Sequence, residues 1–257
     1  MITSSQNARI RRVAQLNSKG KTRRELGLFT AEGRKLFDES PESWREEVYV
    51  SASFAEQNPE LAGSVPCEIV DDRVFAGMCD TKTPQGILTV LRIPQYAPED
   101  LLKKDPPLLV ILEDLQDPGN VGTILRTAES AGACGMIVSR GCADLYAPKT
   151  IRSSMGAVFR MPVVESPDLA ETVRQLKSRG IRVFAAHLDG MRNYCEEDYR
   201  GGSAFLIGNE GNGLSAALSA EADTLIRIPM EGKTESLNAS AAAAILLYTA
   251  HRQRHES

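Results

Sequence analysis

A glycine-rich loop with polar side chains follows a short apolar stretch in the second half of the chain. Residues 204–207 read AFLI, and Gly208, Asn209, Glu210 and Gly211 come directly after them. Glycine lets the backbone approach a ligand closely, while an amide and a carboxylate supply polar groups at the carboxyl end of an expected strand. The same residues are also compatible with a tight turn that carries an ordinary acidic side chain. The loop alone is therefore only a candidate binding site.

Arg126 is unusual for its place in the chain. It lies between Leu125 and Ala128, in a segment whose apolar residues recur at helical spacing after the turn at residues 117–120. A charge within such a helix is most often solvated or paired with an acid. On its own, this position favours the ordinary role over a functional one.

Ser236 and Asn238 precede a helix of small and apolar residues, which we expect over Leu237–His251. Either side chain could cap this helix by accepting a hydrogen bond from a backbone N–H. A helix with so many alanines must be buried on most sides, against the sheet or against a second subunit.

Strand and helix patterns alternate beyond residue 107, which predicts an α/β fold with a mostly parallel sheet and helices on both faces. The expected strands are Leu108–Leu112, Met136–Val138, Phe159–Val164, Val183–Ala186, Ala204–Ile207 and Leu225–Ile228. The expected helices are Val121–Ala131, Pro148–Ser153, Leu169–Arg179 and Leu237–His251.

A separate small α/β domain is expected before this region, over residues 1–95. Its pattern begins with a helix over residues 5–19. The expected strands are Leu28–Ala31, Val48–Val50, Cys67–Val70 and Ile87–Ile93. Residues 94–107 carry four prolines and five charged residues, so we expect a linker over residues 96–107 and a second domain over residues 108–257.

The net charge of −4 conceals an asymmetry. Residues 1–24 contain seven basic residues and no acid, while the other 23 basic residues face all 34 acidic ones. A basic arm on an acidic body is typical of proteins that bind a polyanion, although a solvated helix face would look the same. The candidate contacts for a nucleic acid are Arg11, Arg12, Lys21, Arg23 and Arg24.

Several other classes of protein receive little support. No apolar run approaches the roughly 18 residues of a membrane span, and MITSSQNARIRR lacks the apolar core of a secretory signal. Five cysteines without a C-x-x-C pair indicate reduced thiols in a cytoplasmic protein, and the histidines form no metal-ligand pattern. DPGNVG and GNEGNG have the wrong glycine order for a dinucleotide site, and Arg227 replaces the first glycine of a phosphate-binding loop.

Three stretches together resemble, in order and spacing, the motifs of the SpoU (TrmH-type) RNA ribose methyltransferases of the SPOUT superfamily. They are LLVILEDLQDPGNVGTILRTAESAGACGMIVS at 108–139, AFLIGNEGNGL at 204–214 and IRIPMEGKTESLNASAAAAILLY at 226–248. The N-terminal pattern ITSSQNARI…FTAEGRKLF is similar to the small RNA-binding domain that precedes many members, which resembles a ribosomal-protein fold.

This resemblance implies a deep trefoil knot, S-adenosylmethionine (SAM) bound in a bent shape within it, and a homodimer built on the C-terminal domain. It implies that SAM contacts Ala186, His187, Gly208, Asn209, Gly211, Ile228, Met230 and Leu237. It places around the reacting atoms Asn120, Arg126, Glu210, Ser236 and Asn238.

The implied reaction is methyl transfer from the sulfonium of SAM to a ribose 2′-hydroxyl of ribosomal or transfer RNA. Proposals for the family give Arg126 a role in activating the hydroxyl. Because an arginine is almost always protonated, we favour a clamp on the neighbouring phosphate. The alternatives are a non-catalytic RNA-binding protein that retains the fold and a nicotinamide-dependent oxidoreductase, which the glycine order disfavours.

Overall fold

The computed structural model describes residues 1–234 and 236–256. The chain forms two compact units. The first contains Met1–Gln95 together with Asp144–Phe159, and the second contains Tyr96–Ala143 and the chain from Arg160 onwards. None of the helices in these ranges is long and apolar enough to cross a membrane.

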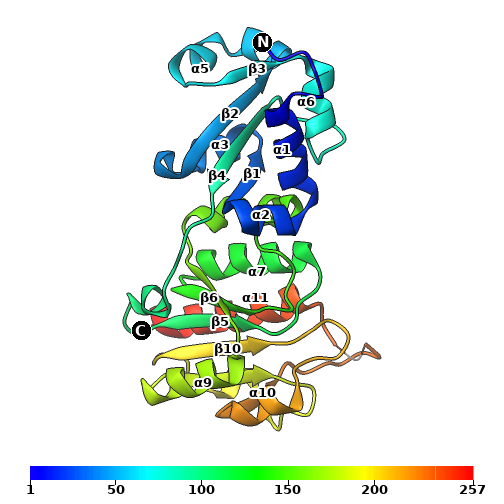
Figure 1. Cartoon of the computed structure of the whole chain (residues 1–257). Coiled ribbons are helices and arrows are strands. Elements are labelled where there is room, and N and C mark those ends of the chain that lie inside the picture. The colour runs from blue at the N-terminus through cyan, green and yellow to red at the C-terminus, as the bar shows by residue number, and fades with distance from the viewer. Residues whose placement is uncertain (235, 257) are drawn as a thin grey trace. The chain divides into compact units, whose positions relative to one another are not determined.

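The first unit is a four-stranded sheet with helices packed on it (Figure 1). The strand order is β1 (Leu28–Glu32), β4 (Ile87–Arg92), β2 (Arg45–Ser51) and β3 (Glu68–Val70). Only the β2–β3 pairing is parallel, and the other two are antiparallel. The helices are α1 (Ala8–Ser18), α2 (Gly20–Leu26), α3 (Arg34–Glu39), α4 (Ala52–Gln57), α5 (Pro59–Ser64) and α6 (Asp72–Met78).

Helix α1 forms where apolar residues recur at spacings of three. Ile10, Val13 and Leu16 are buried, and they pack with Tyr49 and Val90 of the sheet in one apolar cluster. Burial of such a stripe stabilises a helix that its own propensity would leave marginal. The intervening positions of α1 carry Arg9, Arg11 and Arg12, while Arg23 and Arg24 lie on α2.

A segment from the second half of the chain completes the first unit. This segment, Asp144–Phe159, includes α8 (Pro148–Ser154). Its last residue is Phe159, whose ring centroid lies 6.5 Å from that of Phe29 and 6.2 Å from that of Trp44. Phe159 lies in a short 3₁₀ turn, so the expected strand Phe159–Val164 is wrong at its start. β7 spans Val163–Ser166, after Pro162, which has no N–H to donate to the ladder.

The second unit contains a seven-stranded sheet in the order β7-β6-β5-β10-β8-β11-β9. Every pairing between these strands is parallel, which confirms the expected mostly parallel α/β fold. Besides β7 its strands are β5 (Leu108–Leu112), β6 (Gly135–Ser139), β8 (Arg182–Ala186), β9 (Arg192–Asn193), β10 (Ser203–Ile207) and β11 (Thr224–Arg227).

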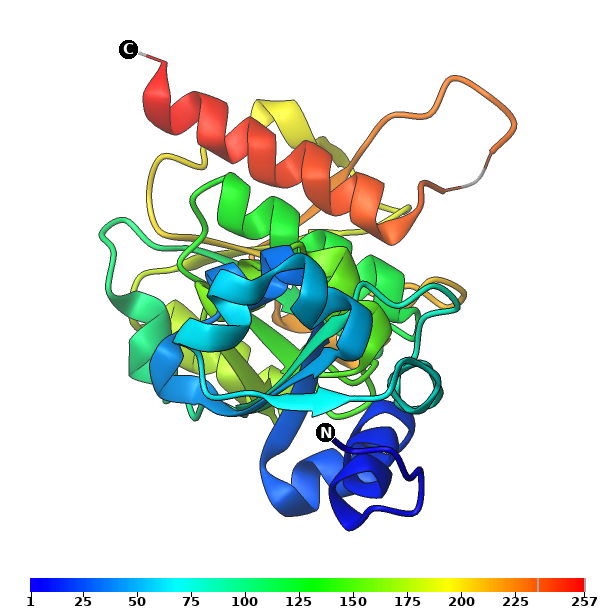
Figure 2. The same ribbon diagram turned by 90° about the horizontal axis from the view of Figure 1, so that it is seen from above.

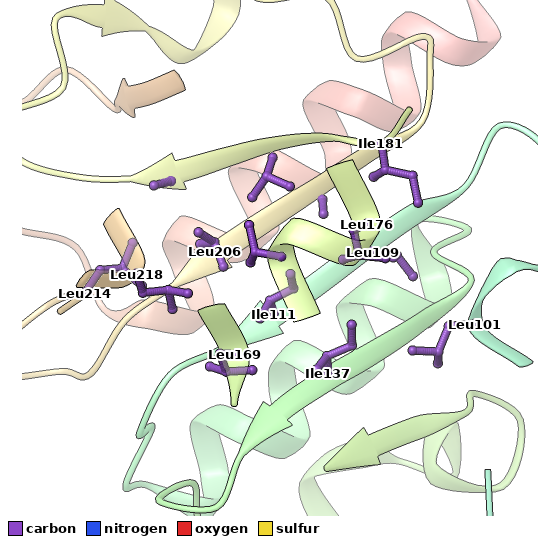
Figure 3. Close-up of a cluster of buried hydrophobic side chains, with 14 of the residues drawn as sticks. Leu101, Leu109, Ile111, Ile137, Leu169, Leu176, Ile181, Leu206, Leu214 and Leu218 are labelled. Atoms are coloured by element: carbon purple, nitrogen blue, oxygen red, sulfur yellow. The ribbon is translucent and has the colours of Figure 1, made fainter. Parts of the chain in front are cut away.

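The strands β5 and β10 are buried along their whole length, as continuous apolar runs in a parallel sheet require. Leu109 and Leu206 contribute to a core that also takes Leu176 from a helix on one face (Figure 3). The helices of this unit are α7 (Pro118–Ser130), α9 (Leu169–Ser178), α10 (Ala216–Glu221) and α11 (Ala239–His255). Helix α11 packs against α7 and β10 (Figure 2).

Part of the proline-rich segment before β5 is packed into the second unit. Residues Pro98–Leu102 form a 3₁₀ helix, and the Leu101 side chain is buried in the core of the parallel sheet. A Cβ atom on Gly135 of β6 would lie 2.3 Å from Leu101 Cδ2, so a larger residue there would require the leucine side chain to move.

Candidate functional site

A cavity of about 360 Å³ lies beyond the carboxyl ends of β8, β10 and β11 and next to the start of α11. This is the edge of a parallel sheet at which ligands gather in α/β proteins, and the volume is typical of a small-molecule site. All eight residues expected to contact SAM line it: Ala186, His187, Gly208, Asn209, Gly211, Ile228, Met230 and Leu237. Glu210 and Ser236 line it as well.

The loop after β10 forms one wall of the cavity and is also a tight turn. A Cβ atom on Gly208 would lie 2.2 Å from the carbonyl carbon of Gly213, so glycine is required there. Asn209 N and Gly213 N each donate to the other's carbonyl oxygen, and Asn209 Oδ1 accepts from Gly211 N at 2.9 Å. The turn interpretation and the binding interpretation of this loop are therefore compatible.

The Glu210 carboxylate collects hydrogen bonds from the loop that begins α7. Its Oε1 accepts from Asn120 Nδ2 at 3.0 Å and from Asp117 N at 3.1 Å, and its Oε2 accepts from Gln116 N at 3.1 Å. Partial burial on its own would raise the pKa of Glu210, but these hydrogen bonds together lower it below its usual value. Glu210 therefore carries a negative charge at neutral pH.

Asn238 joins the third sequence stretch to this network. Its Nδ2 donates to Asn120 Oδ1 at 3.0 Å, while its Oδ1 accepts from Ser240 N at 2.9 Å and caps α11. The same side chain thus performs the structural role expected of a helix cap and contacts the site. Asn120, Glu210 and Asn238, from three separate stretches, form one continuous chain of hydrogen bonds.

Arg126 lies outside this network. It is exposed on α7, six residues after Asn120 and so about 9 Å further along the helix. Within residues 1–234 and 236–256, no hydrogen bond or ion pair engages its guanidinium. The structure therefore leaves this charge free to bind a group from outside the chain.

Asp114 and Gln116 support the loops of the site, and no sequence pattern pointed to either of them. Asp114 has a left-handed backbone with φ of 51°, a conformation that aspartate tolerates better than most residues. Its carbonyl oxygen accepts from Asn209 Nδ2 at 2.7 Å, and its Oδ1 accepts from Ser139 Oγ at 2.6 Å. Gln116 Nε2 donates to the Asp114 and Gly141 carbonyls. The only available signal was the proximity of these residues to the end of a strand.

The expected RNA contacts of the first unit divide into two groups. Arg23 is buried, and its guanidinium donates to Asp144 Oδ2 at 2.8 Å and to the Leu16 carbonyl. Arg12 forms an ion pair with Glu47. Both side chains are engaged inside the unit, and Arg23 is not positioned to meet RNA.

The other three expected contacts remain accessible. Arg11, Lys21 and Arg24 are exposed, and Lys21 forms only a loose pair with Glu25, at 3.7 Å. A pair of this length between exposed groups contributes little, so the charge of Lys21 stays available to a ligand.

Comparison with known proteins identifies the class. Residues 107–248 match the SpoU rRNA Methylase family, and residues 7–89 match the MRM3-like substrate binding domain. The chain belongs to the SpoU methylase family and is a methyltransferase, as its three sequence stretches predicted.

Individual relatives match over nearly the whole chain. The chain is 34% identical to the 23S rRNA (guanosine(2553)-2′-O)-methyltransferase RlmP of Bacillus subtilis, over 96% of this chain and 97% of the relative. It resembles the SpoU methyltransferase AviRb from Streptomyces viridochromogenes in complex with AdoMet, that is, SAM. The TM-score is 0.89 at 28% identity, over 98% of this chain and 100% of the other. For the AdoMet-bound rRNA methyltransferase from Sinorhizobium meliloti, the TM-score is 0.85 at 32% identity, with coverage of 100% and 98%.

Proposed function

We propose that this protein transfers a methyl group from SAM to a ribose 2′-hydroxyl of ribosomal RNA. The observation that carries the proposal is the hydrogen-bonded chain Asn238–Asn120–Glu210 at the edge of the cavity. It joins three distant stretches that have no structural need to share one network of polar side chains. The names of the similar proteins, which include a 23S rRNA 2′-O-methyltransferase and AdoMet complexes, support the same reaction and cofactor.

The residues of the cavity fit SAM. Ile226, Ile228 and Leu237 supply apolar walls for an adenine ring, and the tight loop at residues 208–213 presents backbone groups to it. SAM has no phosphates, so the lack of a phosphate-binding motif in the sequence is no obstacle. The negative charge of Glu210 lies at the same cavity, where it favours a positively charged sulfonium.

When bound, SAM supplies an electrophilic methyl group, and the chain must hold the ribose hydroxyl in line with it. The side-chain amides of Asn120 and Asn238 are hydrogen-bonded to each other and contact the ribose. Glu210 orients these amides by accepting a hydrogen bond from Asn120. Ser236 lines the cavity beside them and offers a hydroxyl for the same purpose. Arg126, whose guanidinium has no partner in the part of the chain that the structure describes, binds the phosphate next to the target ribose. A guanidinium pairs well with a phosphate, and because it is already protonated it cannot accept the proton of the hydroxyl.

The first unit supplies the sequence-independent part of RNA binding in this proposal, through Arg11, Lys21 and Arg24. Phosphate contacts account for much of the affinity of such proteins and little of their choice of sequence. Residues 1–95 and 108–257 then act as a substrate-binding domain and a catalytic domain, in the cytoplasm, where ribosomal RNA is found.

We also infer that the chain is knotted and forms a homodimer through α11. Residues 236 and 237, before this helix, line the same cavity as the loop at residues 208–213, which fits a chain end threaded beneath that loop. Tyr248 of α11 is 48% exposed and follows the small and apolar residues Ala239–Leu247 of the helix, which fits an interface with a second copy.

The test is an in vitro reaction of the purified protein with SAM carrying a labelled methyl group and ribosomal RNA from cells that lack the gene. Mass spectrometry of the digested RNA should show label on one 2′-O-methylated nucleoside. The rival, an RNA-binding protein without activity, predicts RNA binding with no label in any nucleoside. Transfer RNA serves as the competing substrate.

A further inference from the structure

A groove of about 280 Å³ lies between α1 and α6 of the first unit, which pack side by side (Figure 1). Ile10, Ala14 and Val74 line its floor, and Arg11 and Arg73 also line it, one from each helix. Ile10 and Val74 belong to the apolar core of the unit, so the floor is fixed in place by packing. The groove is therefore a preformed apolar surface flanked by two cations.

The two guanidiniums at this groove have no partner among the residues that the structure describes. Their neighbours in the same unit differ: Arg9 is paired with Glu68, and Arg12 is paired with Glu47. Like charges that share a groove repel each other, and an anion bound between them would relieve that repulsion.

The nearby acids are already engaged. Asp72 accepts hydrogen bonds from the backbone N–H and hydroxyl of Ser53, and Asp71 caps α6 by accepting from the N–H of Arg73. Neither carboxylate forms an ion pair with Arg11 or Arg73 in the described part of the chain. In the described part of the chain, the two guanidiniums therefore lie at the groove without a direct ion-pair partner.

We propose that this groove binds one unstacked nucleotide of single-stranded RNA. This inference rests on the proposed function. Charge patterning had already suggested Arg11 as an RNA contact, and the groove adds Arg73 and an apolar surface to it. Arg11 and Arg73 bind the phosphate, and the base lies against the half-buried Ala14 and Val74. Proteins recognise single-stranded RNA through unstacked bases that pack against side chains, arginine guanidiniums among them, while cations hold the backbone.

The size of the groove favours a single nucleotide over a duplex. Its volume lies just below the roughly 300–1,000 Å³ of small-ligand pockets, and a base can reach the floor only when it is not stacked in a helix. Arg73 lies in the acidic body of the chain, outside the basic residues 1–24. Sequence reasoning missed it because its pairing with Arg11 depends on the packing of two helices.

Gly77 offers a clean way to fill the groove. It lines the groove from α6, its backbone is ordinary, and a Cβ atom there would meet nothing within 4 Å. Gly77→Leu therefore blocks the floor without disturbing the core, and leucine is a better helix former than glycine. Gly63→Leu is the matched control, because Gly63 in α5 has equally open surroundings and lies outside the groove.

The experiment measures binding of the full-length variants to a fluorescent 12-nucleotide single-stranded RNA of mixed sequence, by anisotropy. Gly77→Leu should weaken binding about tenfold, and Gly63→Leu should leave it unchanged. Arg73→Gln should weaken binding and flatten the plot of log affinity against log salt by about 0.7, the value for one phosphate contact on a single strand. A blunt duplex of the same sequence should bind all variants alike.

Two results would overturn the inference while the proposed function stands. One is wild-type affinity and salt slope in both Gly77→Leu and Arg73→Gln, with ribosomal RNA still methylated. The other is that AMP binds at the groove and Gly77→Leu abolishes only that binding, which would indicate a mononucleotide site. If the wild-type protein neither binds nor methylates RNA, the proposed function itself fails and the inference fails with it.

Discussion

Removal of the Asn120 side chain should slow methyl transfer more than it lowers stability. Asn120 is the only residue that bonds to both Glu210 and Asn238 among the side chains that the structure describes. A hydrogen bond to a charged group contributes about 1.5–3 kcal/mol when well buried. Because this network is partly exposed, we assign the Asn120–Glu210 hydrogen bond a contribution at the lower end of that range. Since about 1.4 kcal/mol corresponds to a factor of ten, Asn120→Ala should lower the single-turnover rate on the order of tenfold.

A second variant at the same position separates the network from a simple loss of contacts. Asn120→Asp keeps the acceptor for Asn238 but places a second carboxylate about 3 Å from Glu210. Two carboxylates at this distance repel unless they share a proton, so this variant should be slower than Asn120→Ala at pH 8 and recover partly at pH 6.

The assay is methyl transfer to ribosomal RNA under single-turnover conditions, with SAM affinity by calorimetry and the thermal midpoint measured in parallel. Asn193→Ala is the control, because the Asn193 side chain accepts hydrogen bonds from the backbone N–H and thiol of Cys195 at a short 3₁₀ turn in the same unit and does not line the cavity. The reasoning is refuted if both Asn120 variants react at the wild-type rate. It is also refuted if their losses match the fall in thermal midpoint and nothing more.

Other predictions concern the charges, the assembly and the segment at residues 144–159, which belongs to the first unit. Arg126→Ala should abolish methylation and leave SAM affinity within a few-fold, while the control Arg174→Ala on α9 should change neither methylation nor SAM affinity. Wild-type turnover in Arg126→Ala would remove its assigned role. The pKa of Glu210 is lowered in the folded state, so its ionised form stabilises the fold above about pH 4.3. This contribution disappears as the pH falls through the folded-state pKa. In urea melts, Glu210→Gln should therefore lower the free energy of unfolding at pH 7 and lower it much less at pH 3. The protein should be a dimer by light scattering at micromolar concentration, and Tyr248→Glu should shift it to monomer; a monomeric wild type contradicts this. A fragment from residue 96 onwards should be unstable or aggregate. In it Tyr146 loses its contact with Phe29, and Phe159 loses its contacts with Phe29 and Trp44. A sharp two-state melt of that fragment would contradict this packing.

Much of the second unit was predictable because its signals are local. β5 is an uninterrupted apolar run and α7 has helical spacing, so both appear almost as expected. Short elements such as β9 and α10 carry too few residues for a periodic pattern, and they were missed. Phe159 looks like a strand residue in sequence, but its aromatic contacts hold it in a turn.

The site needed a different kind of information. Asn120 and Glu210 are 90 residues apart, and no periodicity predicts that their side chains meet; only the resemblance of the three stretches to a known family suggested it. Arg23 shows the opposite failure. Its charge pattern indicated a polyanion contact, yet a carboxylate 121 residues away, on Asp144, engages it in the interior. Sequence reasoning registers the sign of a charge but not whether the fold supplies its partner.

The most direct test of the central claim is a map of ribose methylation in ribosomal RNA from cells with and without the gene. If the three stretches form one site for ribose methylation, deletion should remove one 2′-O-methyl group from the RNA. The wild-type gene should restore it, and a gene carrying Arg126→Ala, expressed at the same level, should not. An unchanged methylation map after deletion, or full restoration by the Arg126→Ala gene, would contradict the account.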